Sequence, residues 1–222
     1  MSKLYFRYGA MNSGKSTALL QAAFNYEERG QHVLLAKPLM DRKGDRRIVS
    51  RLGVERDIDF GIAPDDDLLS IFAAERQRVQ RTTGHDVACL LVDEAQFLAE
   101  GQVDDLLRIA IELGVPVLAY GIRTDFQTVA FPGSRRLLEI SHSLEELKTI
   151  CRCGRKAMFN ARRVGDRFVF DGDQVAIDTF EDVTYESLCG QCYLDESGGL
   201  LNRGRSKIGA FSYSSGPDPD FS

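Results

Sequence analysis

The chain has 222 residues, of which 43% are hydrophobic and 27% charged, so it suits one ordinary domain with a sizeable core and a small appendage. Its formal net charge of −5 argues against a general nucleic-acid binder, because such proteins carry a basic surface. No apolar run reaches the ~18 residues of a membrane span, and residues 1–9 lack the apolar segment of a signal peptide, so we expect a cytoplasmic protein without nucleic-acid or membrane partners.

The first part of the chain predicts a strand, a helix and a strand in succession. Residues 3–8 are apolar and rich in aromatics, residues 15–29 have apolar side chains at helical spacing up to Gly30, and residues 32–38 are apolar and end in proline. This order and spacing predict a βαβ unit in a parallel sheet. The basic stretch 40–57 is predicted to be a mobile loop that leads into a short element.

The middle of the chain repeats the alternation. The predicted elements are an amphipathic helix over 64–82, a strand over 86–92, a second amphipathic helix over 102–114 and a strand over 115–122. Together with the first unit, they predict an α/β fold with a parallel sheet flanked by helices.

The composition changes near residue 150. Residues 151–177 have short alternating runs and a turn at 165–166, which predicts a β-hairpin module that ends at the cysteine pair 189–192. Residues 197–222 are rich in Gly and Ser and show little periodicity, so we predict a loose tail.

A phosphate-binding motif lies between the first predicted strand and helix. The stretch "GAMNSGKS" fits G-x-x-x-x-G-K-[ST] at every fixed position. In such a loop, backbone N–H groups surround phosphate oxygens, the lysine reaches the β- and γ-phosphates, and the serine hydroxyl binds Mg²⁺. The predicted nucleotide-binding residues are Gly9, Ala10, Met11, Asn12, Ser13, Gly14, Lys15 and Ser16.

An acidic pair follows the strand over 86–92. In "LLVDEAQF", Asp93 is predicted to bind Mg²⁺, and Glu94 is then free to act as a base on a hydroxyl or water. The alternative is a solvated strand end that caps the next helix. Asp93 and Gln96 are placed with the nucleotide-binding residues, and the absence of an N-K-x-D tetrad favours ATP over GTP.

Four of the five cysteines form the pattern C-x-C…C-x-x-C. Cys151, Cys153, Cys189 and Cys192 suit a closed tetrahedral Zn²⁺ site with a structural role. The alternative is four buried, reduced thiols. Cys89 lies in the apolar run "VACLLV" and is predicted to be a core residue.

Several motifs together resemble one family. The similarity runs from about residue 3 to 193 and rests on "YGAMNSGKSTALLQAAFNYEERG", "LLVDEAQFL", "VLAYGIRTDFQTVAFPGS" and "ELKTICRCGRKA". The chain thereby resembles type II thymidine kinases of the bacterial kind. The resemblance implies ATP-dependent phosphorylation of thymidine at its 5′-hydroxyl to give dTMP for nucleoside salvage. It also implies a RecA-like P-loop core, a zinc module carrying a lasso over the nucleoside, a homotetramer and feedback inhibition by dTTP.

The resemblance also assigns roles and boundaries. Glu94 is implied as the catalytic carboxylate, with Lys15 and Arg42 stabilising charge on the phosphates, although arginines in such a run are often simply solvated. The residues implied to contact the nucleoside are Phe97, Phe126, Phe131 and Tyr185, of which Phe97 and Phe131 could alternatively be core aromatics. We expect a P-loop kinase domain over 1–148, a zinc and lasso domain over 149–198 and a flexible tail over 199–222.

One stretch departs from the family pattern. In "AIDTFEDVTY", Asp178 and Thr179 replace the usual glycines, and two additional residues precede Tyr185. A longer lasso could shift the backbone groups that recognise the base. A kinase with altered base selectivity therefore remains an alternative, as does, less favoured by the acidic charge, a zinc-ribbon RecA-like ATPase acting on nucleic acid.

Overall fold

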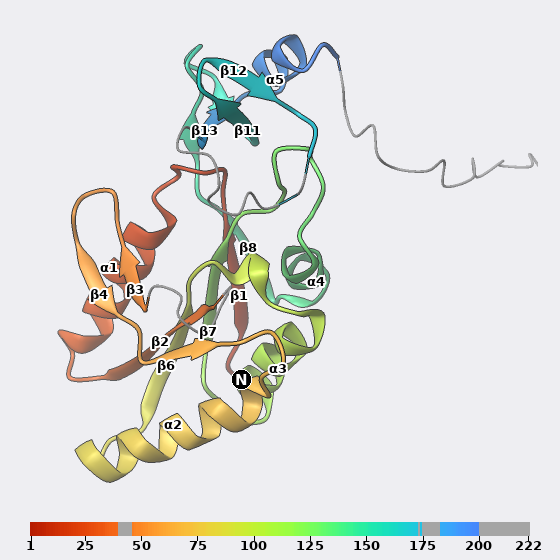
Figure 1. Cartoon of the computed structure of the whole chain (residues 1–222). Coiled ribbons are helices and arrows are strands. Elements are labelled where there is room, and N and C mark those ends of the chain that lie inside the picture. Colours follow the sequence, from red (N-terminus) through yellow and green to blue (C-terminus); the bar gives the residue numbers. More distant parts are fainter. Residues whose placement is uncertain (40–45, 173, 175–182, 200–222) are drawn as a thin grey trace, which may run out of the picture.

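The computed structural model describes residues 1–39, 46–172, 174 and 183–199 (Figure 1). Its centre is a parallel sheet with the strand order β5-β2-β6-β7-β1-β8. The strands are β1 (Leu4–Tyr8), β2 (His32–Pro38), β5 (Phe60–Ile62), β6 (Val87–Val92), β7 (Val117–Gly121) and β8 (Ser143–Glu146). The expected α/β fold of the P-loop type is confirmed.

Helices cover both faces of this sheet (Figure 1). On β2, Val33 and Leu35 pack with α1 (Lys15–Glu27), whereas Leu34 and Ala36 pack on the opposite face. The helices of that opposite face are α2 (Leu68–Thr83), α3 (Glu100–Ile111) and α4 (Pro132–Ile140). Because side chains alternate between the two faces of a strand, strands covered on both sides are apolar throughout.

Local signals fix where α2 begins and ends. The helix begins at Leu68, later than predicted, because the Asp67 side chain accepts a hydrogen bond from the Ser70 N–H at 3.1 Å and caps the first turn. It ends at Gly84, whose φ of 75° is in the left-handed region that glycine adopts easily.

Several short elements were not predicted. The stretch after β2 contains an antiparallel hairpin of β3 (Arg47–Val49) and β4 (Glu55–Asp57), which Ile48 anchors to the α1 face of the sheet. The strands β5 and β8 and the helix α4 were also missed. The mobile loop and short element predicted over 40–57 are, from residue 47 onward, the β3–β4 hairpin, whereas residues 40–45, including Arg42, lie outside the described residues.

The second module packs against the loops at the carboxyl ends of the sheet strands (Figure 1). It consists of β9 (Thr149–Ile150), β10 (Lys156–Ala157), β11 (Phe159–Val164), β12 (Arg167–Val169), β13 (Val183–Leu188) and α5 (Gly190–Glu196). The predicted turn at 165–166 joins β11 to β12. The module has its own small core, which includes Ala161, Leu188 and Tyr193.

Two sequence-based expectations fall partly outside the described residues. The predicted tail is not placed from residue 200 onward, and the altered lasso is not placed over 175–182. Of the helices in the described ranges, none combines the length and the apolar character that crossing a bilayer requires.

Candidate active site

The phosphate loop connects β1 to α1 in a tight path. Asn12 and Gly14 adopt φ values of 65° and 78°, and Gly14 is the N-cap of α1. A Cβ on Gly9 would lie 2.4 Å from Ser13 Oγ and 2.5 Å from the Leu147 carbonyl oxygen, so only glycine fits there. N–H groups in the first turn of a helix have no partner within the helix, so those of α1 are suited to binding an anion.

Lys15 lies buried inside this loop. Its Nζ donates hydrogen bonds to the carbonyls of Ala10 at 2.9 Å and Gly9 at 3.4 Å. Burial lowers the pKa of Lys15, while the nearby charges of Glu94 and Asp93 act in the opposite direction. A phosphate group would offer this ammonium a stronger acceptor than the two carbonyls.

Ser16 and Asp93 form the hydroxyl–carboxylate pair expected of a Mg²⁺ site. Ser16 Oγ donates to Asp93 Oδ2 at 3.1 Å, and Asp93 is 4% exposed. Burial and, next, the charge of Glu94 raise the pKa of Asp93 to about 6. Oxygen ligands of this kind, one hydroxyl and one carboxylate beside a phosphate loop, suit the hard cation Mg²⁺.

Glu94 follows Asp93 with a strained backbone. Its φ of 50° is in the left-handed region, which costs a non-glycine residue about 1–3 kcal/mol. One carboxylate oxygen accepts a hydrogen bond from Gln96 Nε2, and Gln96 Oε1 accepts from the Ile122 N–H at 3.2 Å. Gln96 thus links Glu94 to the loop after β7 through hydrogen bonds. A contact between Gln96 and the nucleotide stays a prediction.

An aromatic cavity of about 260 Å³ lies beside Glu94. All four aromatic residues predicted to contact the nucleoside line it: Phe97, Phe126, Phe131 and Tyr185. The rings of Phe97 and Phe131 meet edge to face with centroids 5.4 Å apart. Flat apolar walls with a few polar groups are typical of a site for a planar ligand such as a nucleobase.

Sequence reasoning missed three polar residues around this cavity. The guanidinium of Arg162 lies 3.7 Å from the Phe126 ring centroid, and its Nε donates to the Tyr185 hydroxyl at 3.2 Å. Asp125 and Asn160 line the cavity directly. The only signal in the sequence was the alternation along β11, which places Asn160 and Arg162 on the same face of the strand.

A larger groove of about 980 Å³ opens over the phosphate loop. Lys15 and Ser16 line its floor, and Arg51 and Leu52 from the β3–β4 hairpin line its side. The groove and the aromatic cavity share the residues Met11, Glu94, Ile122 and Tyr185. Glu94 therefore lies where a phosphate chain in the groove and a ligand in the cavity would meet.

The four clustered cysteines come together in the second module. The sulfur atoms of Cys151, Cys153, Cys189 and Cys192 all lie within 4.8 Å of one another. A tetrahedral Zn²⁺ with Zn–S bonds of about 2.3 Å needs sulfurs roughly 3.8 Å apart, so the four residues fit such an ion. Cys89 is fully buried in the core, as predicted.

Within this cluster, the pKa values of Cys189 and Cys192 are shifted in opposite directions. The Cys192 N–H donates to Cys189 Sγ at 3.5 Å, and this bond is the main cause that lowers the pKa of Cys189 to about 6. Cys192 donates its S–H to the neighbouring cysteine sulfurs, and these hydrogen bonds raise the pKa of Cys192. A bound metal would displace the remaining protons, because thiolates are its ligands. The cluster indicates a structural metal.

The parallel sheet and the phosphate loop after its first strand define a P-loop protein. The serine–aspartate pair and the carboxylate beside the aromatic cavity indicate adjacent sites for a nucleotide and a second ligand. Comparison with known proteins is more specific. The thymidine kinase family model matches residues 2–193. The chain therefore belongs to the thymidine kinase family, a family of enzymes, and the resemblance inferred from the motifs is confirmed.

Curated relatives agree over most of the chain. It is 48% identical over 191 residues to the thymidine kinase of Rhizobium meliloti, covering 85% of this chain and 94% of that one. It is 46% identical over 200 residues to the thymidine kinase of Ruegeria pomeroyi, covering 89% and 96%. The thymidine kinase of Enterobacteria phage T4 is 45% identical over 192 residues, covering 85% and 94%. Membership of this kinase family implies use of ATP and a nucleoside substrate.

Proposed function

We propose that the chain transfers the γ-phosphoryl group of ATP to the 5′-hydroxyl of thymidine and so forms dTMP in nucleoside salvage. One observation supports this reaction most directly: Glu94 lines both the phosphate groove and the aromatic cavity. A carboxylate at that junction can accept the proton of a hydroxyl that attacks the terminal phosphorus in line.

In this proposal the donor side consists of the phosphate loop and the serine–aspartate pair. Backbone N–H groups between Gly9 and Ser16 bind the phosphates, and Lys15 exchanges its loop carbonyls for phosphate oxygens. Ser16 and Asp93 would hold Mg²⁺, which neutralises charge on the phosphates when bound. Arg42, predicted to help, lies outside the described residues.

The acceptor side is the aromatic cavity. Phe126 has one face covered by Arg162, so its ring is held in place to stack on the base. The Tyr185 hydroxyl accepts from Arg162, which fixes that ring at the mouth shared with the phosphate groove. Phe97 and Phe131 complete the apolar wall.

The remaining assignments extend the proposal beyond the site. We take the metal of the cysteine cluster to be Zn²⁺ with a structural role, because a closed four-thiolate site leaves no open position for a substrate. The functional division is a kinase domain over 1–148, a zinc and lasso domain over 149–198 and a tail over 199–222. A cytoplasmic homotetramer inhibited by dTTP follows from the family resemblance.

A nucleoside panel tests the proposal. Purified protein is supplied with ATP, Mg²⁺ and each of thymidine, deoxyuridine, deoxycytidine, deoxyadenosine and deoxyguanosine, and 5′-monophosphates are measured by chromatography. We expect dTMP as the dominant product. The departures at Asp178 and Thr179 favour one second candidate, a kinase of relaxed base choice, which would phosphorylate another nucleoside at a comparable rate. ATP hydrolysis without any monophosphate would refute both.

A further inference from the structure

The backbone of Met11, in the phosphate loop, is held on both sides by the second module. Its N–H donates to Asn160 Oδ1 at 2.7 Å, and its carbonyl accepts a hydrogen bond from Ser187 Oγ. Asn160 is 3% exposed and Ser187 is 8% exposed, so water competes little for either side chain. Met11 in the phosphate loop is therefore held by hydrogen bonds to side chains 149 and 176 positions away in the sequence.

The two gripping side chains form one structural unit. Asn160 on β11 and Ser187 on β13 are directly opposite each other in the antiparallel pair. Opposite residues of paired strands project from the same face of the sheet, so both side chains reach the loop together. The ladder between β11 and β13 runs from the pair Phe159–Leu188 to the pair Val164–Val183 and keeps the two side chains at a fixed spacing.

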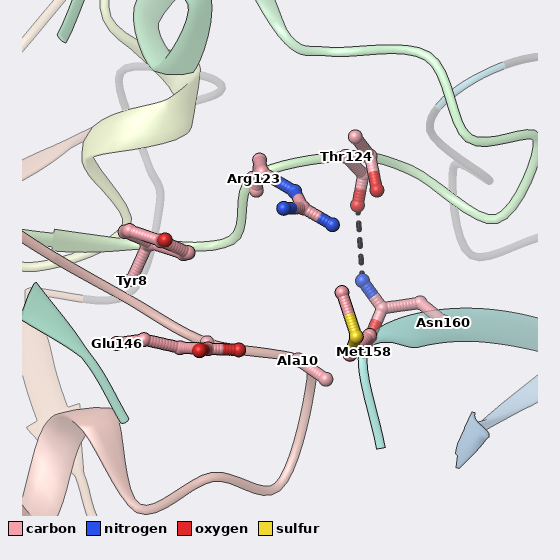
Figure 2. A pocket seen from close by; sticks show the side chains of 8 residues that line it. Tyr8, Ala10, Arg123, Thr124, Glu146, Met158 and Asn160 are labelled. Carbon is pink, nitrogen blue, oxygen red and sulfur yellow. Dashed lines mark hydrogen bonds between the residues drawn. The ribbon is translucent and has the colours of Figure 1, made fainter. Parts of the chain in front are cut away.

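Asn160 also reaches the loop that follows β7. Its Nδ2 donates to the Thr124 carbonyl at 2.9 Å, as the dashed line in Figure 2 marks. The amide thus uses its acceptor on the phosphate loop and its donor on the neighbouring loop, a combination that a carboxylate could not provide. The small space that Figure 2 draws beside it holds about 10 Å³, enough for about one water molecule, so this is a packing junction and no ligand site.

The two hydrogen bonds to the Met11 backbone matter most when a nucleotide is bound. In the structure, Lys15 helps to hold the loop through the carbonyls of Gly9 and Ala10. Once Lys15 turns to phosphate oxygens, those bonds are lost, whereas the Met11 N–H and carbonyl keep their bonds to Asn160 and Ser187. The first-turn N–H groups of α1 stay open for the anion.

We infer that Asn160 and Ser187 are positioning residues that hold the phosphate loop in its binding shape through Met11. They would lower the cost of ordering the loop and so raise nucleotide affinity. The inference rests on the proposed function only in taking the loop as the ATP site, and it assigns neither residue a contact with ATP.

Ser187→Ala gives the cleanest test, because Ser187 is not among the described residues that line the aromatic cavity. Binding of a non-hydrolysable ATP analogue with Mg²⁺ is measured by calorimetry on the full chain. We expect affinity to fall about 3- to 10-fold, the effect of one net hydrogen bond. The KM for ATP should rise by the same factor, while the KM for thymidine stays within about twofold.

Ser197→Ala is the matched control. Ser197 is 5% exposed in the same module, where it follows the last residue of α5, and its hydroxyl donates to the Leu194 carbonyl. It should lose stability like Ser187→Ala without a change in analogue affinity. Asn160→Ala should also weaken the analogue, and the double variant with Ser187→Ala should lose less than the product of the two factors, because both act on one residue.

Unchanged analogue affinity in Ser187→Ala, or an equal loss in Ser197→Ala, would overturn the inference. So would strictly multiplicative effects in the double variant. These readings are separate from the nucleoside panel: a wild-type protein that binds the analogue but phosphorylates no nucleoside would refute the proposed function and leave the grip on Met11 standing.

Discussion

Replacing Glu94 by glutamine separates catalysis from binding at this site. The change keeps the shape of the side chain and an oxygen that can accept from Gln96, but it removes the negative charge that attracts the hydroxyl proton. Removing a positioned general base typically costs about 10²–10⁴-fold in rate, or about 2.7–5.4 kcal/mol of activation free energy.

The structure adds a second, linked consequence of Glu94→Gln. Because the charge of Glu94 helps to raise the pKa of Asp93 to about 6, its loss should move that pKa down toward its ordinary value. The variant should therefore bind Mg²⁺ and the ATP analogue at least as well as the wild type at pH 6. Slow chemistry combined with retained nucleotide binding distinguishes a lost base from a damaged site.

The assay is single-turnover formation of dTMP by rapid quench, with calorimetry of the ATP analogue on the same protein. Glu100→Gln serves as the control, because Glu100 is exposed and pairs with Arg135 outside both cavities. A Glu94→Gln rate within about tenfold of the wild type would refute the role of Glu94. A comparable loss of rate in Glu100→Gln would show that the effect is not specific.

Three further predictions follow from the site. As the proposed Mg²⁺ ligand, Asp93 would bind the metal only when ionised, so activity at low Mg²⁺ should be lost as the pH falls through about 6, and raising Mg²⁺ should shift this loss to lower pH; a pH profile that does not change with Mg²⁺ would contradict the assignment. Cys189→Ser should lower the bound metal per chain and the unfolding midpoint by at least about 4 °C, while Cys89→Ser should keep its metal; full metal content in Cys189→Ser would count against the cluster. Phe126→Ala should raise the KM for thymidine about 10- to 100-fold through lost ring contact, with no such rise for the exposed Phe24→Ala; equal values would remove Phe126 from the nucleoside site.

The parts of the fold that the sequence predicted are those with strong local patterns. The runs that form β1, α1 and β2 match the structure within two residues, because apolar periodicity and Gly30 mark them clearly. β8 was missed because it is an edge strand, with the polar sequence SLEE, where Glu145 pairs with Arg7 of β1 instead of entering the core. The three-residue strands β3, β4 and β5 are too short to show a period.

The site divides in the same way. Lys15, Ser16, Asp93 and Glu94 were predictable because each lies in a contiguous motif whose spacing reflects its chemistry. Asn160 was not, because its partners are backbone groups of two loops 149 and 36 positions earlier, and the alternation along β11 gives its face of the strand but not these partners. Only the fold brings these groups together.

The left-handed backbone at Glu94 places conformational strain at the proposed catalytic base. A glycine at this position would relieve the backbone strain, so a screen for thermal resistance alone would favour Glu94→Gly, although this change removes the proposed base. Thermal stability and turnover therefore place opposite demands on this one residue. Substitutions intended to stabilise the enzyme should keep Glu94 and be made in the surface helices instead.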